Sequence, residues 1–145
     1  MAHRVTDLDY RALAEFRYRI RLFLETSEKA ARTAGLEPEQ YQLLLAVRGM
    51  PRGREATMQA LAERLRVRHN TAVERVDRLA LAGFLFRTRS RKDGRRVLVE
   101  LRAKGRRMLE GLARKHLIEL RRSGPELIRS LTKVAAATRR SAPKR

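Results

Sequence analysis

The sequence predicts a mainly α-helical protein with one small β-hairpin. Two observations carry this prediction: apolar residues recur at three- and four-residue steps over most of the chain, and only residues 84–102 read as strands instead. Gly and Pro separate the helical stretches. With 145 residues, 43% of them hydrophobic, the chain is long enough to enclose a core. We therefore expect a single folded domain over residues 1–145.

The first helix is expected from about residue 7 to residue 34, and Gly35 supplies its stop. Its main apolar stripe has helical spacing and consists of Leu13, Phe16, Ile20, Phe23 and Leu24. Tyr18 and Leu22 point away from that stripe, so the helix is apolar on more than one face. Such a helix lies either between two partners or in a large monomer core, and the sequence alone leaves both interpretations open.

Three shorter helices follow. Pro38 fits the first turn of a helix over residues 38–50, and residues 51–55 form a loop. Thr57 is a suitable N-cap for a third helix over residues 58–67, with Leu61 and Leu65 inward. After a brief turn, a fourth helix is expected over residues 69–81, and Gly83 ends it.

Two strands are expected in "FLFRTRS" and "RRVLVELR", joined across "RKDG". Asp93-Gly94 between strand-like runs is a hairpin signal, because both residues tolerate positive φ. Val97 and Val99 share one face of the second strand and are expected to anchor it on the core. Helix returns at about residue 103, where "SGP" is expected to break it and Pro125 to open a last helix.

The charge of the chain narrows its function. The formal net charge is +19 and the isoelectric point is about 11.7. Such an excess indicates a polyanionic partner, nucleic acid first and an anionic membrane second, and the alternative is a merely basic surface. No run reaches the ~20 apolar residues of a spanning helix, and no secretion signal is present, so we expect a cytoplasmic protein at the nucleoid.

Several kinds of site are not expected. The chain has no Cys, and its three His residues are too far apart for ligand spacing, so no metal or other cofactor is predicted. Paired carboxylates, a nucleophile elbow and a phosphate-binding Gly loop are also missing from the sequence. The sequence therefore gives no reason to expect an enzyme.

Two short helices with a tight turn between them, followed by a basic hairpin, fit a winged helix-turn-helix. In the fourth helix, Ala72, Val76 and Leu79 cluster on one side. The opposite face carries groups that read base edges and hold phosphates, and the expected contacts on this helix and its start are Arg68, His69, Asn70, Thr71, Glu74, Arg75 and Arg78. The alternative is a solvated face on which Glu74 and Arg78 bridge each other.

Specific roles follow from side-chain chemistry. Arg75 or Arg78 suits guanine and Asn70 suits adenine, whereas Thr71 can contact a thymine methyl group or a phosphate. Glu74 is expected to organise an Arg rather than to read cytosine. His69, at the helix start, contacts a phosphate or acts as a cap.

The hairpin is expected to bind DNA through cations that line its two strands: Arg87, Arg89, Arg91, Lys92, Arg95 and Arg96. A protruding ribbon can straddle phosphates while its tip enters the minor groove, where Arg is favoured. Asp93 is the one acid at the tip, and we expect it to hold the tip in shape by pairing with an Arg or by bonding turn amides. The alternative is a hairpin that is basic only for solubility.

Residues 56–105, with "LAERL", "TAVERVDRLALAGF", the "DGR" of the wing and "VLVEL", resemble the MarR family of bacterial transcriptional regulators. The resemblance implies that Arg95 enters the minor groove, that Asp93 shapes the wing, and that residues 57–65 support the recognition helix. It also implies a two-fold homodimer formed by helices at both ends. The layout becomes dimerisation helices 7–34 and 103–138, a winged helix-turn-helix 38–102 and a basic tail 139–145.

The chain departs from the family pattern at two positions, and the family suggests one further ligand. Arg66 stands where the family often has Gly in the turn, and Arg102 stands where it usually has Thr before the fifth helix. Many relatives bind a small phenolic or aromatic effector, and the residues expected to line such a cleft here, with core packing as the alternative, are Tyr10, Phe16, Tyr18 and Tyr41.

The function predicted from these features is that of a homodimeric, sequence-specific regulator of transcription that binds double-stranded DNA, most often a repressor. Its operator is expected to be pseudo-palindromic, because a two-fold dimer presents two recognition helices to successive major grooves. Release by a small effector is expected from the resemblance. The alternative is a largely non-specific or architectural nucleic-acid-binding protein.

Overall fold

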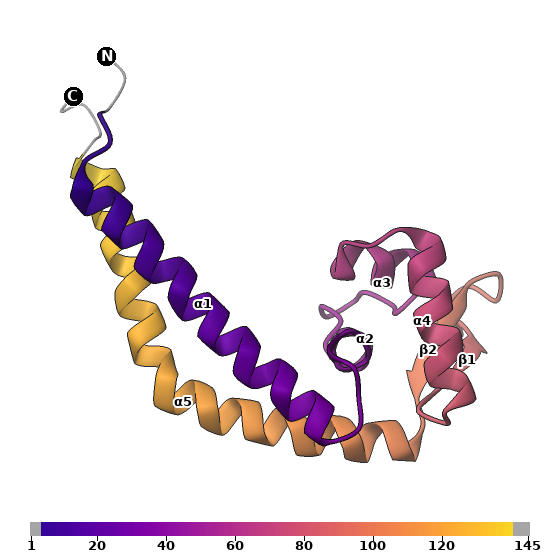
Figure 1. Ribbon diagram of the computed structural model, residues 1–145. Helices are drawn as coiled ribbons and strands as arrows, with labels where there is room; N and C mark the ends of the chain where they lie inside the picture. Colours follow the sequence, from indigo (N-terminus) through magenta and orange to yellow (C-terminus); the bar gives the residue numbers. More distant parts are fainter. Residues whose placement is uncertain (1–3, 141–145) are drawn as a thin grey trace. The chain divides into compact units, whose positions relative to one another are not determined.

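The computed structural model describes residues 4–140, with side chains as far as Ala137, and its mostly helical chain with one antiparallel hairpin confirms the expected fold class (Figure 1). The elements are α1 (Asp7–Thr33), α2 (Pro38–Arg48), α3 (Met58–Leu65), α4 (His69–Leu81), β1 (Leu85–Arg89), β2 (Val97–Leu101) and α5 (Ala103–Arg140). The chain divides into two compact units, residues 1–29 with 115–145 and residues 30–114, which we call the helical unit and the winged unit. Residues 141–145 of the expected basic tail lie outside the described residues.

The helical unit consists of most of α1 and the later part of α5, which run side by side (Figure 1). Phe16, Ile20 and Phe23 are half-buried between them. The Arg19 guanidinium pairs with Glu15 at 2.8 Å and reaches Glu126 of α5 at 3.7 Å. A two-helix unit has one packed seam, so most of each helix surface remains in contact with water.

Large apolar side chains of the helical unit remain exposed in the single chain, at Leu8, Tyr10, Leu13, Tyr18, Leu22, Leu24, Leu117, Ile118, Ile128 and Leu131. The interpretation of α1 as part of a large monomer core is therefore wrong for its exposed positions, because Tyr10 and Tyr18 of α1 are 62% and 52% exposed. Exposed apolar side chains at this density along two helices are unusual for a monomer.

The winged unit has a compact core. Its fully buried side chains come from each short helix and from both strands, and they include Leu43, Leu44, Leu61, Val76, Leu79, Leu85 and Val99. The hairpin is antiparallel, with Leu85 opposite Leu101 and Arg89 opposite Val97. Residues 56–57 add a short third edge to the sheet, because Val99 N donates to Ala56 O at 2.9 Å and Thr57 forms a bridge with Leu98.

The helix starts and stops follow local rules. Thr57 Oγ1 accepts a hydrogen bond from Ala60 N at 3.1 Å, so the expected N-cap of α3 is confirmed. Gly35 and Gly83 both have positive φ just after a helix, as expected of Gly stops. Arg66 ends α3 with φ 57° and ψ 42°, the left-handed conformation that a Gly adopts without strain. At the position where the family often has Gly, Arg66 therefore adopts a backbone conformation that favours Gly.

The start of α5 is docked on the backbone of Phe84. Arg102 N donates to Phe84 O at 2.9 Å, and Lys104 Nζ donates to Ala82 O at 2.9 Å. Gly105 is required here, because a Cβ at this position would lie 2.3 Å from Phe84 O. Arg102 also accepts the first helical hydrogen bond, from Arg106 N at 2.9 Å, so α5 begins without the family's Thr.

Three local expectations were wrong. α5 runs unbroken through Ser123–Pro125, so there is one long helix instead of two. Val97 is 42% exposed, and only Val99 of the expected pair anchors β2 on the core. The expected hairpin is present, but its strands are joined by residues 90–96, a longer connection than the expected "RKDG", and neither Asp93 nor Gly94 is among the described residues with positive φ. Within residues 4–140, no helix combines the length and the apolar character needed to span a membrane.

Candidate nucleic-acid interface

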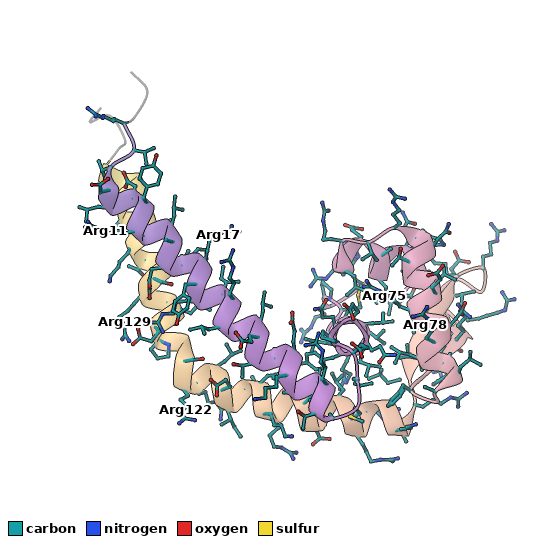
Figure 2. All side chains as sticks on the ribbon, in the orientation of Figure 1. Arg11, Arg17, Arg75, Arg78, Arg122 and Arg129 are labelled. Atoms are coloured by element: carbon teal, nitrogen blue, oxygen red, sulfur yellow. The ribbon has the colours of Figure 1, made fainter. Side chains whose placement is uncertain are left out.

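The exposed face of α4 carries the side chains expected to contact DNA. Ala72, Val76 and Leu79 are buried against the core, which fixes the rotation of the helix. Arg75 and Arg78 lie about one turn apart along α4 (Figure 2). Asn70, Glu74 and Arg78 are exposed, Thr71 and Arg75 are half-buried, and Arg68 and His69 are exposed at the N-terminus of the helix. The structure thus brings all seven residues expected from the sequence onto one element.

None of these seven side chains has an ion-pair or hydrogen-bond partner within residues 4–140. In particular, no ion pair joins Glu74 to Arg78 there, so the alternative in which those two side chains neutralise each other is not what the structure shows. The carboxylate that does form an ion pair on α4 is Asp77, whose Oδ1 lies 2.6 Å from Arg87 Nη2 on β1. This pair links the helix to the hairpin.

The cations of the hairpin fall into two groups. Arg87 pairs with Asp77, Arg96 Nη1 lies 3.6 Å from Glu55 Oε1, and Arg89 Nη1 donates to Gly94 O at 2.9 Å. These three guanidiniums are held by groups of the winged unit itself. By contrast, the side chains of the second group have no such partner in the part of the chain that the structure describes, and they are Arg91, Lys92 and Arg95. All three lie in the exposed loop at the tip.

Asp93 shapes the tip by bonding a turn amide. Its Oδ1 accepts from Arg95 N at 3.0 Å, and its carbonyl oxygen accepts from Arg96 N at 3.0 Å. Of the two positioning roles expected for Asp93, bonding of turn amides is therefore the one that the structure shows.

Sequence reasoning missed Ser90 and Glu55. Ser90 is only 4% exposed, and its hydroxyl donates to Glu55 Oε2 at 2.7 Å. Ser90 Oγ in turn accepts from Lys92 N and Asp93 N, both at 3.2 Å. A Ser two and three residues before two turn amides is a recognisable local motif, but its carboxylate partner lies 35 residues earlier in the chain. The sequence could therefore indicate the bonds from Ser90 to its own turn, but not its contact with Glu55.

A polar cleft of about 420 Å³ separates the wing loop from α3 and the loop before it. Glu55, Asp93 and Arg96 line it together with Arg54 and Glu63, whose side chains lie 4.0 Å apart. Within residues 4–140, no cluster of three or more His, Asp or Glu side chains is arranged to hold a metal ion.

The four aromatic residues expected at an effector cleft do not share one environment. Tyr10 and Tyr18 are exposed on α1, and Phe16 is half-buried there. Tyr41 belongs to the core of the winged unit, where burial raises the pKa of its hydroxyl group. The winged unit also has an apolar groove of about 360 Å³, which is lined by Leu45, Arg48, Leu101, Arg106, Leu109, Glu110 and Ala113.

Known proteins share this fold. The sequence model of the MarR family matches residues 34–96. AbsC, a MarR family transcriptional regulator from Streptomyces coelicolor, has a TM-score of 0.71 and 22% identity over 94% of this chain and 93% of that one. MepR, a transcription regulator of the Staphylococcus aureus multidrug efflux pump MepA, has a TM-score of 0.69 and 14% identity over 85% of this chain and 95% of that one.

CouR from Rhodococcus jostii RHA1, in a structure bound to p-coumaroyl-CoA, has a TM-score of 0.61 and 22% identity over 70% of this chain and 69% of that one. No curated protein sequence matches the chain. The family match and the structural neighbours together confirm the resemblance seen in the sequence: residues 34–96 match the sequence model of the MarR family, and the fold of the chain is that of MarR family transcriptional regulators.

Proposed function

We propose that this MarR family protein is a homodimeric, sequence-specific regulator of transcription that binds double-stranded DNA and acts as a repressor. The observation that carries the proposal is the division of the cations in the winged unit. Internal acids and a carbonyl group hold Arg87, Arg89 and Arg96, while Arg91, Lys92 and Arg95 at the tip and Arg75 and Arg78 on α4 keep their donors for a ligand. Clustered cations without internal partners suit a polyanion.

In this proposal α4 enters the major groove and the wing tip enters the adjacent minor groove. Arg75 or Arg78 addresses guanine and Asn70 addresses adenine, because a guanidinium and an amide match those base edges bidentately. Arg68, His69 and Thr71 contact the DNA backbone at the start of the helix. Arg95 reads the narrow minor groove, and Arg91 and Lys92 hold its phosphates.

The proposed homodimer is formed by the helical unit. Its exposed apolar residues would be buried against the same two helices of a second copy, in a closed two-fold arrangement. We expect Ile118→Glu to reduce the dimer to monomers in analytical ultracentrifugation. The matched control is Leu81→Glu, which changes a 91% exposed Leu of the winged unit and should leave the dimer intact. Equal behaviour of both variants would count against this interface.

The experiment that tests the function is selection of bound sites from a random duplex pool, followed by affinity measurements on the recovered site. We expect a two-fold motif with half-sites about 34–36 Å apart and an affinity ratio of ~10³ or more over random duplex at physiological salt. A ratio near one would favour the architectural alternative, which the net charge of +19 also allows. The salt dependence of the affinity does not distinguish a specific regulator from an architectural protein, because both classes show it. In a reporter assay, a repressor lowers transcription from a promoter that carries the site.

A small phenolic or aromatic effector is proposed to release the DNA. The support is the p-coumaroyl-CoA bound by CouR, which shares the fold. Tyr10, Phe16, Tyr18 and Tyr41 remain the residues proposed to line its site, and Tyr41 would need to leave the core to do so. Addition of phenolic acids and their CoA thioesters to the protein–operator complex tests this. Failure of every compound to release DNA would remove the effector from the proposal.

A further inference from the structure

We propose that Glu55 is a positioning residue that acts through Ser90 to hold the wing tip in its DNA-binding conformation. This inference rests on the proposed function, because it assigns a role in DNA binding to two residues that are not expected to touch DNA. Glu55 lies in the loop before α3, outside both the recognition helix and the hairpin.

The contacts form a chain from the core of the winged unit to the tip. Ala56, the residue after Glu55, is fixed to the sheet through Val99 N. Glu55 Oε2 then accepts the Ser90 hydroxyl at 2.7 Å, and Ser90 Oγ accepts the amides of Lys92 and Asp93. A fixed carboxylate therefore determines where the Ser90 oxygen lies, and that oxygen determines the path of the backbone that carries the tip cations.

Burial makes this contact stronger than an ordinary surface contact. Ser90 is 4% exposed, and the Glu55 side chain is 19% exposed. A hydroxyl that donates to a carboxylate forms a charge-assisted hydrogen bond, which is shorter and stronger than a neutral one. The Asp77–Arg87 pair also ties the hairpin to the rest of the unit, but its side chains are 50% and 40% exposed, and exposed pairs contribute little.

The loop needs such an anchor. It extends over residues 90–96, and its other backbone closures are the hydrogen bonds from Ser90 N to Arg96 O and from Arg96 N to Asp93 O. Arg91, Lys92 and Arg95 lie within this loop and repel one another. Glu55 counters that repulsion at the base, where its Oε1 lies 3.6 Å from Arg96. Without Glu55, the cations are expected to spread and the tip to sample many conformations.

The first test uses the unbound protein. In Ser90→Ala and in Glu55→Ala, hydrogen exchange at the amides of Lys92 and Asp93 should become at least about tenfold faster, as expected from the loss of about 1.4 kcal/mol of protection. Amides of α4 should exchange at the wild-type rate, which shows that the unit remains folded. Unchanged exchange at both tip amides in a folded Glu55→Ala protein would overturn the inference.

The second test uses the selected DNA site. Glu55→Ala should weaken binding about tenfold, whereas Glu55→Gln, whose amide oxygen can still accept the Ser90 hydroxyl, should bind within about threefold of wild type. The matched control is Glu63→Ala, which removes another acid of the same cleft that pairs with Arg54 and not with the wing. Equal losses in Glu55→Ala and Glu63→Ala would mean that the cleft's negative charge matters and the Ser90 contact does not.

A double-mutant cycle distinguishes positioning from general stability. If Glu55 acts by placing the tip cations, Glu55→Ala should cost less affinity in an Arg95→Ala background than in the wild-type protein. Additive losses would overturn the positioning role. If Arg95→Ala alone leaves binding unchanged, the wing is not a DNA contact and the proposed function fails at the wing. If Arg95→Ala weakens binding and Glu55→Ala does not, only this inference fails.

Discussion

Gly105 tests how closely α5 is docked on the winged unit. Gly inside a helix is normally a weakness, and its replacement by Ala stabilises a helix by up to ~1 kcal/mol. At Gly105 we expect the opposite sign, because an added Cβ would lie 2.3 Å from Phe84 O and 3.2 Å from the Phe84 carbonyl carbon. Both of these atoms belong to the backbone, which cannot move aside as a flexible side chain can.

The size of the effect follows from the displacement required. Carbon and oxygen atoms that are not bonded to each other pack at a little over 3 Å, so the start of α5 would have to move by about 1 Å. That movement strains the hydrogen bonds that Arg102 N and Lys104 Nζ make to this segment, each 2.9 Å long. Overpacking of this kind costs ~1–3 kcal/mol, which exceeds the gain in helix propensity. We expect Gly105→Ala to lose about 1–2 kcal/mol.

Gly111→Ala is the matched control. Gly111 lies on the same helix, is exposed, and has no neighbouring atom within 4 Å of an added Cβ. Its replacement by Ala should therefore stabilise the protein by about 0.5–1 kcal/mol. Urea denaturation at one fixed protein concentration measures both changes, because the stability of a dimer depends on concentration. If Gly105→Ala were as stable as Gly111→Ala, α5 would not be packed closely against the backbone of Phe84.

Three further predictions concern the turn, a buried histidine and the recognition helix. Arg66→Gly should raise the free energy of unfolding by about 0.5–1 kcal/mol, because Gly adopts φ 57° without strain, and urea denaturation measures this change. If Arg66 also holds a phosphate, the same substitution should lower the salt slope of DNA binding by about one, which a salt titration measures. His116 is 8% exposed, and burial lowers its pKa, with partial opposition from a hydrogen bond to the Ser27 backbone. As the pH falls through about 6.5, His116 therefore binds a proton more readily in the unfolded chain than in the folded protein, so the free energy of unfolding should fall as the pH drops from 7.5 to 5.5. In urea titrations at several pH values, His116→Leu should make this pH dependence weaker. Asn70→Ala and Arg75→Ala should each relax preference at one base pair per half-site, at a cost of ~1–3 kcal/mol in competition binding; a uniform loss over all sites would mean that they contact only the backbone.

The sequence predicted the parts of the fold that depend on local periodicity. The start and end of α4 follow from one apolar stripe and from Gly83, and both bounds agree with the structure. Thr57 could be recognised as an N-cap because its side chain bonds an amide three residues away. The two polar sides of the proposed interface, α4 and the wing, were also visible, because their side chains face away from a core that the apolar residues define.

The unbroken course of α5 was not predictable from local signals. "SGP" has the composition of a helix break, and Pro125 removes one helical hydrogen bond. The helix continues because contacts on both sides of Pro125 hold it. Within the helix, Ser123 Oγ donates to Glu119 O at 2.9 Å, and after Pro125 the carboxylate of Glu126 lies 3.7 Å from Arg19 of α1. The contact with α1 is distant in sequence, so no local pattern could indicate it.

A contact distant in sequence was also missed at the wing. Asp-Gly between two strand-like runs predicts a hairpin joined across "RKDG", and that prediction considers only residues within the hairpin. Ser90 donates to Glu55 in the loop before α3 and accepts two amides of its own loop, and the connection between the strands extends over residues 90–96. The carboxylate that contacts Ser90 therefore lies 35 residues before it in the chain, where no pattern within the hairpin could reveal it.

The distribution of charge in the winged unit explains how a folded protein tolerates so many cations. The guanidiniums on β1 and at the start of β2 have local acceptors: Arg87 has Asp77, Arg89 has the carbonyl oxygen of Gly94, and Arg96, the residue before β2, has Glu55. These contacts reduce repulsion where the hairpin must keep its register. At the tip no such acceptor is present among the described residues, so the repulsion there is relieved only by water, salt or a ligand. When a DNA phosphate backbone binds these cations in place of water and salt, the DNA releases its own counterions, and this release favours binding. The cations expected to destabilise the free wing are for this reason the ones proposed to bind DNA, and the stability of the wing in the unbound protein should rise with salt while its affinity for DNA falls.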